Sequence, residues 1–248
     1  MYMKLRNIIA ATLIAGTSCL VSCDKVVDKA MQTMIESVSN HDYQDSEKWG
    51  KVVTIDLPTI GFSEVELSGA VRLEYKQDSI YSVQLYGNEK AIEAYAITSE
   101  GDELEATLKE GTGSVNKNTP AITLRITAPH ITEIQATGAS DINFIDSIAQ
   151  DKELELTIVG AGKVKMDNLS LTEDMEVVTT GAATLQGRVE CRKLKLKMSG
   201  AGSGNLDIHS KQARLALSGA VDVTLSGECH DLSYTATGSS SVKRDGLK

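Results

Sequence analysis

The chain of 248 residues carries 34 acidic and 25 basic residues, a formal net charge of −9 at pH 7. Phosphate-binding surfaces depend on clustered positive charge, so this balance argues against a nucleic-acid partner. Aromatic residues make up 4% of the chain, with two Phe and one Trp. Stacking platforms for sugar rings are therefore scarce, which argues against a carbohydrate cleft.

The first 22 residues have the pattern of a secretory signal. Lys4 and Arg6 precede an apolar run, 8–15, that is too short to span a bilayer. Next comes Leu20-Val21-Ser22-Cys23, which resembles a bacterial lipobox, in which the cysteine is acylated and becomes the first mature residue. We predict a lipoprotein signal peptide over 1–22 and lipidation of Cys23, with stable membrane attachment through two or three acyl chains. The alternative is an ordinary signal peptide with an unmodified cysteine.

Residues 23–50 are predicted to be the lipid anchor and a tether. Apolar residues recur at helical spacing between Val27 and Val38, and the polar stretch 41–46 follows. This pattern predicts a short amphipathic helix and then a linker, which would hold the folded body off the lipid surface. Without residues 1–22 the chain has 23 basic and 34 acidic residues, a net charge of −11. We expect this acidity to favour solubility.

Residues 51–248 are predicted to form one β domain, because apolar residues alternate with polar ones from Val52 onward. The one interruption with helical character is 88–95. Within this domain a glycine followed by a small residue recurs seven times, at Gly69, Gly138, Gly160, Gly181, Gly200, Gly219 and Gly238. The last six are 22, 21, 19, 19 and 19 residues apart, a period typical of one coil of a solenoid.

Alignment on these glycines places the apolar residues at even offsets, so one parity should line a common interior. An example is the column of Leu156, Val177, Leu196 and Leu215. We predict an all-β fold, a single-stranded parallel β-helix with coils of about 19–22 residues, right-handed by the usual crossover bias. A β-prism or a sandwich is the alternative. The glycines are expected on the inward side, where opposite walls nearly touch, and 52–127 is expected to form wider, irregular coils.

The outward carboxylates also align in this register. Glu133, Glu155 and Glu176 share one column, which continues as Lys195 and Arg214. The simplest interpretation is a solvated face with charge pairs where the sign changes. The alternative is a divalent cation site at Glu155, Asp174 and Glu176, because calcium prefers oxygen ligands. We predict no catalytic residue and no cofactor.

The two remaining cysteines, Cys191 and Cys229, lie two coils apart in the same column. Two strand spacings, roughly 9–10 Å, exceed the Cα separation that a disulfide tolerates. We therefore predict free thiols. The histidines show no metal-ligand spacing.

The aligned motifs Ala136-Thr137-Gly138-Ala139-Ser140-Asp141 and Leu217-Ser218-Gly219-Ala220-Val221-Asp222 resemble the family of putative auto-transporter adhesins with a head GIN domain. The similarity runs from about Val52 to the end of the chain. The Gly-Ile-Asn triplet is replaced here, Gly69-Ala70-Val71 being its nearest counterpart. The resemblance implies a secreted or lipid-anchored β-helical protein of Gram-negative bacteria, with no catalytic residues to carry over.

Together these observations predict a noncatalytic, lipid-anchored cell-envelope protein. We expect it at the outer membrane, on its periplasmic or its surface face, attached through the lipid. Its rigid outward face would serve adhesion or contact with a protein or glycan ligand. A polysaccharide-active β-helix enzyme and a purely structural envelope protein are the alternatives.

Overall fold

The computed structural model describes residues 46–59, 61–109 and 121–248. Its elements are α2 Ser46–Trp49, β1 Val52–Leu57, β2 Glu64–Gln77, β3 Ser82–Asn88, α3 Glu89–Glu93, β4 Tyr95–Glu100, β5 Glu103–Leu108, β6 Ile122–Ala128, β7 Glu133–Gln150, β8 Leu154–Leu171, β9 Met175–Gly238 and β10 Ser241–Leu247. The fold is all-β, with one large mixed sheet that does not close into a barrel. The signal segment, Cys23 and the amphipathic pattern over 24–45 lie outside the described residues.

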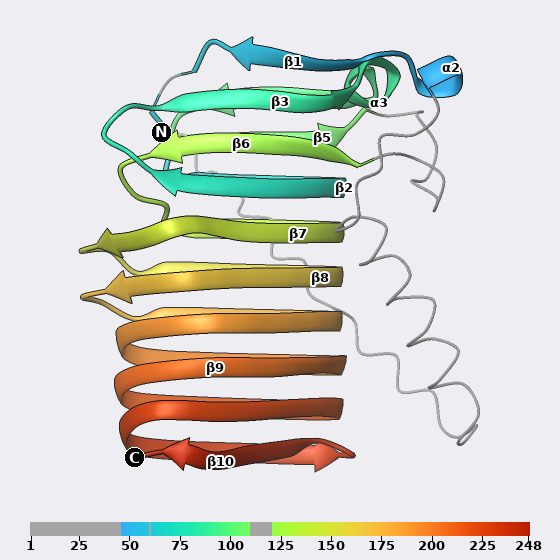
Figure 1. Cartoon of the computed structure of the whole chain (residues 1–248). Coiled ribbons are helices and arrows are strands. Elements are labelled where there is room, and N and C mark those ends of the chain that lie inside the picture. The colour runs from blue at the N-terminus through green and yellow to red at the C-terminus, as the bar shows by residue number, and fades with distance from the viewer. Residues whose placement is uncertain (1–45, 60, 110–120) are drawn as a thin grey trace, which may run out of the picture.

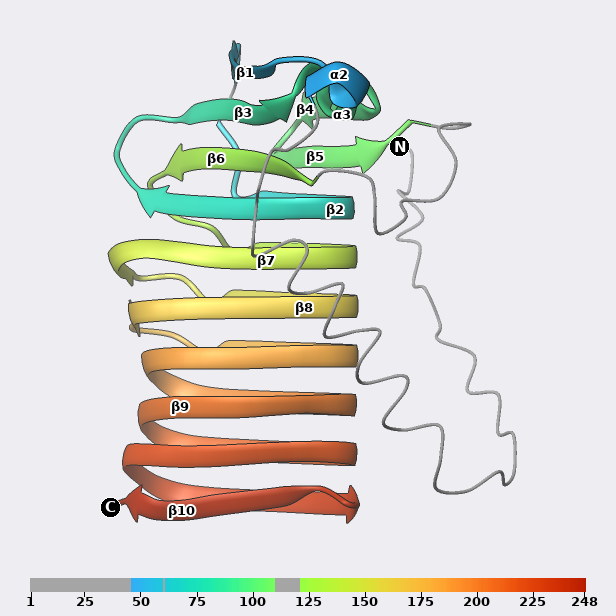
Figure 2. The same cartoon turned by 45° about the vertical axis from the view of Figure 1, so that its right-hand side comes forward.

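The strands β2, β7, β8, β9 and β10 pair in parallel and lie one above another (Figure 1). Glu133 of β7 pairs with Glu155 of β8, and Leu154 of β8 pairs with Met175 of β9. The long strand β9 winds through several turns without a break (Figure 2). Residues 19 apart meet within it, for example Gln212 and Asp231. This is the vertical alignment that the glycine spacing predicts.

The region before β7 differs from the irregular coils that we expected. The strand β3 pairs antiparallel with both β1 and β6, and β4 and β5 form an antiparallel pair. The expectation was wrong because short strands joined by tight connections can pair as antiparallel neighbours, which a coil-to-coil alignment does not reveal. The helical turn predicted over 88–95 is present as α3.

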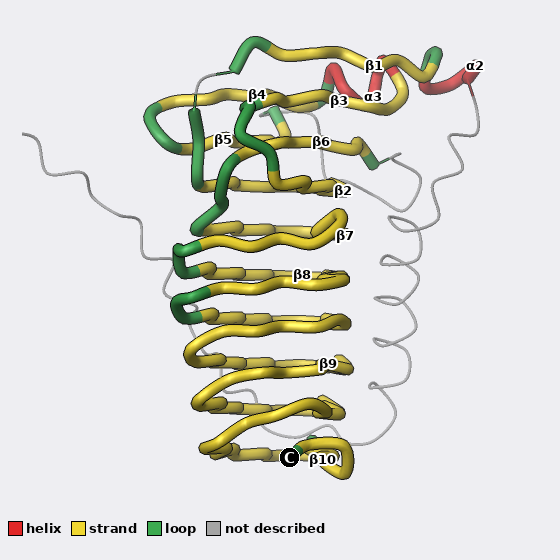
Figure 3. Tube along the Cα trace, turned by 60° about the vertical axis from the view of Figure 1, so that its left-hand side comes forward, coloured by secondary structure: helices red, strands yellow, loops and turns green. Residues whose placement is uncertain are grey.

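The strand β2 joins the two regions (Figure 3). Its first part pairs with β5 and its second part with β6, while its whole length lies beside β7. Gly69 separates the two parts and pairs directly with Gly138, so β2 is the first full turn of the stack despite the 69 residues between these glycines.

One apolar core runs through both regions. The predicted column of Leu156, Val177, Leu196 and Leu215 is buried throughout, with exposed fractions of 0–3%. Where β2 meets β7, Tyr75 packs edge-to-face on Phe144 with ring centroids 6.0 Å apart. The alternating pattern is therefore confirmed as the inside and outside of the strands.

The glycine column has a different cause from the one that we expected. All seven repeat glycines have positive φ, between +76° and +121°, and Gly138 and Gly200 are exposed, not inward. A Cβ on Gly160 would collide with the carbonyl oxygen of Gly138 in the turn above, and the same holds at each later turn. The close approach is therefore between successive turns, not between opposite walls. Only glycine suits both the left-handed backbone and the contact.

Tyr95 of β4 covers the first glycine of this column. Its hydroxyl accepts a hydrogen bond from the amide of Ala70 at 2.8 Å and donates one to the Ala70 carbonyl at 3.0 Å. Burial raises the pKa of this phenol to about 12. The antiparallel region thus closes the top of the stack with a fixed, neutral side chain.

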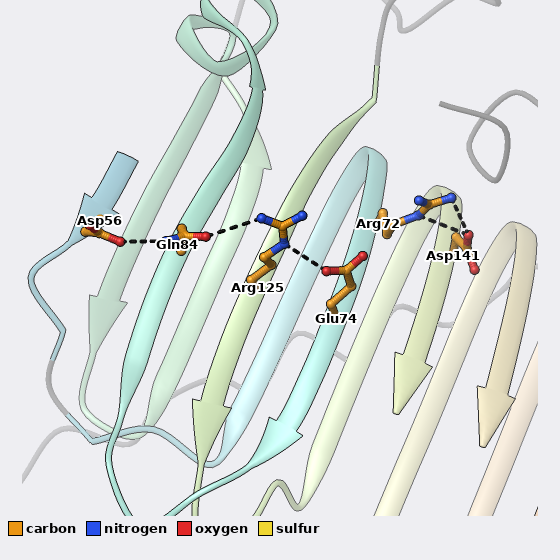
Figure 4. A network of polar contacts seen from close by, with 6 residues as sticks. All are labelled: Asp56, Arg72, Glu74, Gln84, Arg125 and Asp141. Carbon is orange, nitrogen blue, oxygen red and sulfur yellow. Dashed lines mark hydrogen bonds and ion pairs between the residues drawn. The ribbon is translucent and has the colours of Figure 1, made fainter. Parts of the chain in front are cut away.

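A row of polar side chains crosses the outer face of the sheet from the antiparallel region into the stack (Figure 4). Gln84 donates to Asp56 at 2.9 Å and accepts from Arg125 at 3.4 Å, and Arg125 pairs with Glu74 at 2.9 Å. Beyond β2, Arg72 pairs with the buried Asp141 of β7 at 3.1 Å. The contacts of Gln84 join antiparallel strands and the two ion pairs join parallel ones, so the row supports the register of both kinds of pairing.

Candidate functional site

One glutamate lies near the start of each of five neighbouring strands, and these glutamates form a column. The pairing registers place Glu103, Glu64, Glu133, Glu155 and Glu176 side by side on β5, β2, β7, β8 and β9. We call these five residues the acidic ladder. They alternate along their strands with buried residues such as Ile134 and Leu156, so they face outward. Because the strands are in register, successive carboxylates are about one strand spacing, roughly 4.8 Å, apart.

Four residues of the ladder, all except Glu103, line a groove with a volume of about 480 Å³. The charged residues that line it are Glu64, Glu133, Glu153, Glu155, Asp174, Glu176, Lys193, Lys195 and Arg214. The acids gather on β2, β7, β8 and the beginning of β9, and the bases follow on later turns of β9. The groove therefore has an acidic end and a basic end along the axis of the stack. Aromatic side chains do not occur among its described lining residues.

The sign changes at Glu176. Its carboxylate accepts hydrogen bonds from Lys195 at 2.7 Å and from Lys197 at 3.2 Å. Burial alone would raise the pKa of Glu176, but these two ammonium groups outweigh it and lower the pKa. The pKa of Lys195 is raised by the same hydrogen bond. The expected charge pair where the column changes sign is thus present.

Glu155, one turn above, has the opposite shift. Desolvation raises its pKa, and the neighbouring carboxylates of Glu133 and Glu176 raise it further. Adjacent residues of one column therefore have pKa values pushed in opposite directions. Glu176 accepts hydrogen bonds from the lysines, whereas the charge of Lys195 lowers the pKa of Glu155 by less than burial and the neighbouring carboxylates raise it.

The predicted cation ligands Glu155, Asp174 and Glu176 all line the groove. Two of them are already engaged, Glu176 with the lysines and Asp174 with Arg192 at 2.9 Å. Calcium there would have to compete with these ion pairs, and the site stays a prediction.

Among the described residues, a different acidic group brings its oxygens together. Glu66, Glu103 and Glu105 each offer an oxygen within 4.8 Å of the others, and all three side chains are half-buried. Desolvation, followed by the charges of Glu105 and Glu103, raises the pKa of Glu66. The sequence carried a signal in the repeated Glu-x-Glu of 64–66 and 103–105, but only the pairing of β2 with β5 joins them.

The other candidate residues are placed as follows. Cys191 and Cys229 are both free thiols, as predicted, and Ser210 donates to the Cys229 sulfur at 3.5 Å from the turn between them. Burial raises the pKa of the Cys191 thiol to about 12, which disfavours the thiolate that reacts as a nucleophile. His209 and His230 line a second hollow, where His209 Nε2 lies 3.5 Å from Asp207. Neither described helix is long and apolar enough to cross a membrane.

The sequence matches the family described as "Putative auto-transporter adhesin, head GIN domain" in two overlapping segments, residues 61–190 and 173–248. Together these segments cover both the antiparallel region from β2 onward and the whole stack. No curated protein is significantly similar to the chain.

Solved structures share this fold at low sequence identity. A putative adhesin from Bacteroides fragilis has a TM-score of 0.56 and 17% identity over 78% of this chain and 96% of its own. A putative adhesin from Parabacteroides distasonis has a TM-score of 0.54 and 13% identity over 79% and 95%. A putative adhesin from Parabacteroides merdae has a TM-score of 0.53 and 12% identity over 78% of this chain and 96% of its own. At these identities the likeness establishes the fold alone.

Proposed function

The chain belongs to the putative auto-transporter adhesin, head GIN domain family, and from this premise we propose that it is a noncatalytic, lipid-anchored protein of the cell envelope that presents a rigid face for adhesion. We propose that β2, β7, β8, β9 and β10 form a single-stranded, right-handed parallel β-helix. The helix would act as a spacer, and the charged groove would be the contact surface.

The acidic ladder is the observation that supports this role. In-register strands hold its carboxylates in one row, so a partner meets a pre-organised surface that loses little conformational freedom on binding. Its acidic end suits a cationic segment of a protein ligand, and the lysines and Arg214 at the other end suit an anionic one. A buried aliphatic residue follows each carboxylate along its strand, such as Ile134, Leu156 and Val177, and this packing keeps the row straight.

Lipid anchoring through Cys23 is the second part of the proposal. It rests on the Leu20-Val21-Ser22-Cys23 sequence. The family supports a place in the cell envelope, and within it we propose the outer membrane of a Gram-negative cell. Metabolic labelling with a fatty-acid analogue tests it. We expect label on the wild-type chain and none on Cys23→Ser, while equal labelling of both chains would contradict the assignment.

The adhesive role is tested with a glycan and host-matrix array, probed with a soluble form beginning at Asp24. We expect binding that the double variant Glu133→Lys, Glu155→Lys abolishes. The matched control is Glu190→Lys, Glu228→Lys, which makes the same charge change at exposed residues outside the groove and should bind normally. Silence of the wild-type form would contradict adhesion and favour a purely structural envelope role.

One observation favours a polysaccharide-active enzyme as a second candidate. Glu155 and Glu176 are neighbours whose pKa values move apart, the pattern of a general acid beside an ionised carboxylate. The lack of aromatic platforms in the groove favours adhesion over this alternative. An assay for reducing ends released from an acidic polysaccharide tests this alternative. Release by the wild-type chain that is lost in Glu155→Gln would favour the enzyme and contradict our proposal.

A further inference from the structure

Among the described strands, the final turn of the stack leaves its outer edge unpaired. Its first wall is Leu232–Gly238, the end of β9, which we call the edge segment. The backbone amide of Ser239 and the hydroxyl of Thr237 donate to carbonyls of the preceding turn, at 2.7 Å to Gly219 and 3.3 Å to Leu217. In the part of the chain that the structure describes, the sheet ends at β9 and β10 (Figure 1).

The core columns continue into the edge segment but lose their cover there. Tyr234 stands in the column of Leu196 and Leu215, yet it is 42% exposed where they are 0% and 3% exposed. Leu232 is half-buried and Ala236 is exposed. The interior of the stack therefore reaches solvent at this edge.

The edge segment also lacks the features that normally prevent strand pairing. Proteins protect edges with charged residues, proline or bulges. From Leu232 to Val242 the chain has no charged residue and no proline. The second wall, β10, does have them, with Lys243, Arg244 and Asp245 and a register shift at this point.

The edge segment is complementary to itself in antiparallel register. A two-fold axis at Thr235 would place Tyr234 opposite Ala236 and Ser233 opposite Thr237 of a second copy. Inward residues would then meet only inward residues, because a two-fold on a residue preserves the alternation of faces. A large side chain faces a small one, and hydroxyls face hydroxyls.

The second wall agrees with the same axis. Arg244 of the second wall lies beside Tyr234, the neighbour of Thr235 in the first wall, so an axis through Thr235 passes near Arg244. Lys243 would then oppose Asp245 of the second copy, an attractive pair. Arg244 would approach its own copy, and its guanidinium already lies over the Tyr234 ring at 5.9 Å.

We propose that two copies of this chain dock edge to edge through Leu232–Gly238, with the strands antiparallel about Thr235 and the two cores continuous across the interface. Backbone hydrogen bonds provide the affinity, and the facing Tyr234 and Ala236 set the register. Two stacks joined in this way place their antiparallel regions at opposite ends of one long body.

Sedimentation velocity of the full chain in nonionic detergent, from about 1 to about 100 µM, tests this proposal in the range of micromolar association. We expect a reversible dimer that Thr235→Lys weakens at least about tenfold, because the two new charges would face each other on the axis. Lysine is tolerated in this column, since Lys197 occupies it two turns earlier. A wild-type chain that is monomeric throughout would overturn the proposal.

The matched control is Ala216→Lys, an exposed residue of the same column one turn away from the edge. It should dimerise like the wild type, and equal loss in both variants would show that net charge, not the edge, controls association. A second variant, Thr235→Cys, should form an interchain disulfide on oxidation, because residues paired on the axis lie within disulfide range. Ala216→Cys should not. Crosslinking of both or of neither would refute the register.

Discussion

The antiparallel region and the stack hold similar strands together by different means. Between β1 and β6 each strand has a particular partner, and polar contacts such as Gln84 with Asp56 support the pairing. From β7 onward one pattern of buried columns and glycines repeats at every turn. The difference shows that a repeated pattern makes the stack predictable from the sequence and allows whole turns to be added. The irregular region instead closes the top of the stack with Tyr95 and α3.

The largest expected effect is the difference in stability lost when a glycine of each region is replaced by alanine. In the stack, Gly160→Ala should cost at least about 4 kcal/mol of unfolding free energy, because the Cβ collides with backbone at positive φ. In the β4–β5 turn, Gly101→Ala also has positive φ but open space around it, so about 1 kcal/mol is expected. Urea unfolding measures both. Equal losses would contradict the between-turn contact as the reason for glycine.

A second prediction compares the middle of the stack with its edge. Leu196→Ala leaves a cavity in a fully buried column and should cost about 3 to 4 kcal/mol. Tyr234→Ala removes a larger side chain from the same column at the exposed edge, and it should cost about 1 kcal/mol or less. Thermal unfolding at low protein concentration tests this order, since dimers would protect Tyr234. A reversed order would be inconsistent with an open edge.

The junction of the two regions gives the third prediction. Arg72→Met leaves the carboxylate of Asp141, 4% exposed, without its cation, which should cost about 2 to 3 kcal/mol. The matched surface pair Arg188 and Asp207 is exposed, and Arg188→Met should cost about 0.5 kcal/mol. Chemical denaturation of the two variants compares them. If both cost the same, the junction pair does not hold β2 against β7.

The smallest effect is a pH dependence within the acidic ladder. A carboxyl whose folded pKa is raised favours the folded state at low pH, and this benefit is lost as the pH rises from about 4.5 through the folded pKa. Glu155→Gln should therefore stabilise slightly at pH 7, by less than about 0.5 kcal/mol because solvent screens the group. Below about pH 4 the two chains should unfold alike, since both then carry a neutral side chain.

Glu176→Gln should have the opposite sign, because the folded pKa of Glu176 is lowered. Its stabilisation is present above the ordinary pKa and is lost as the pH falls. Thermal melts of both variants between pH 4 and 7 test the pair. Shifts of the same sign would contradict the assignment of the lysine hydrogen bonds to Glu176.

The sequence predicted the stack well because its evidence is repeated. The same pattern, in which residues at even offsets from the glycine face inward, occurs at every turn. The structure buries all four residues of the predicted column, Leu156, Val177, Leu196 and Leu215. The neighbours of Glu133, Glu155 and Glu176 followed from the same alignment.

The antiparallel region could not be predicted in this way, because its pairings occur once. Nothing periodic links Glu66 to Glu105, which meet only because β5 lies beside β2. The sequence correctly predicted that the repeat glycines lie in one column, but the predicted reason for glycine at these positions was wrong. Its offset from the buried residues is even, which indicated an inward side, but a positive φ turns the backbone and breaks the alternation at that residue.

The equal turns of β9 make the height of the molecule adjustable in small, fixed steps. Each 19-residue unit, such as the one from Gly181 to Gly200, adds one strand spacing of about 4.8 Å. In-frame duplication of such a unit would bring its own glycine, its own buried leucines and its own place in the column, and it would leave every other turn unchanged. Copying or deleting a short stretch of DNA could thus change the height of this protein without changing how its other turns pack.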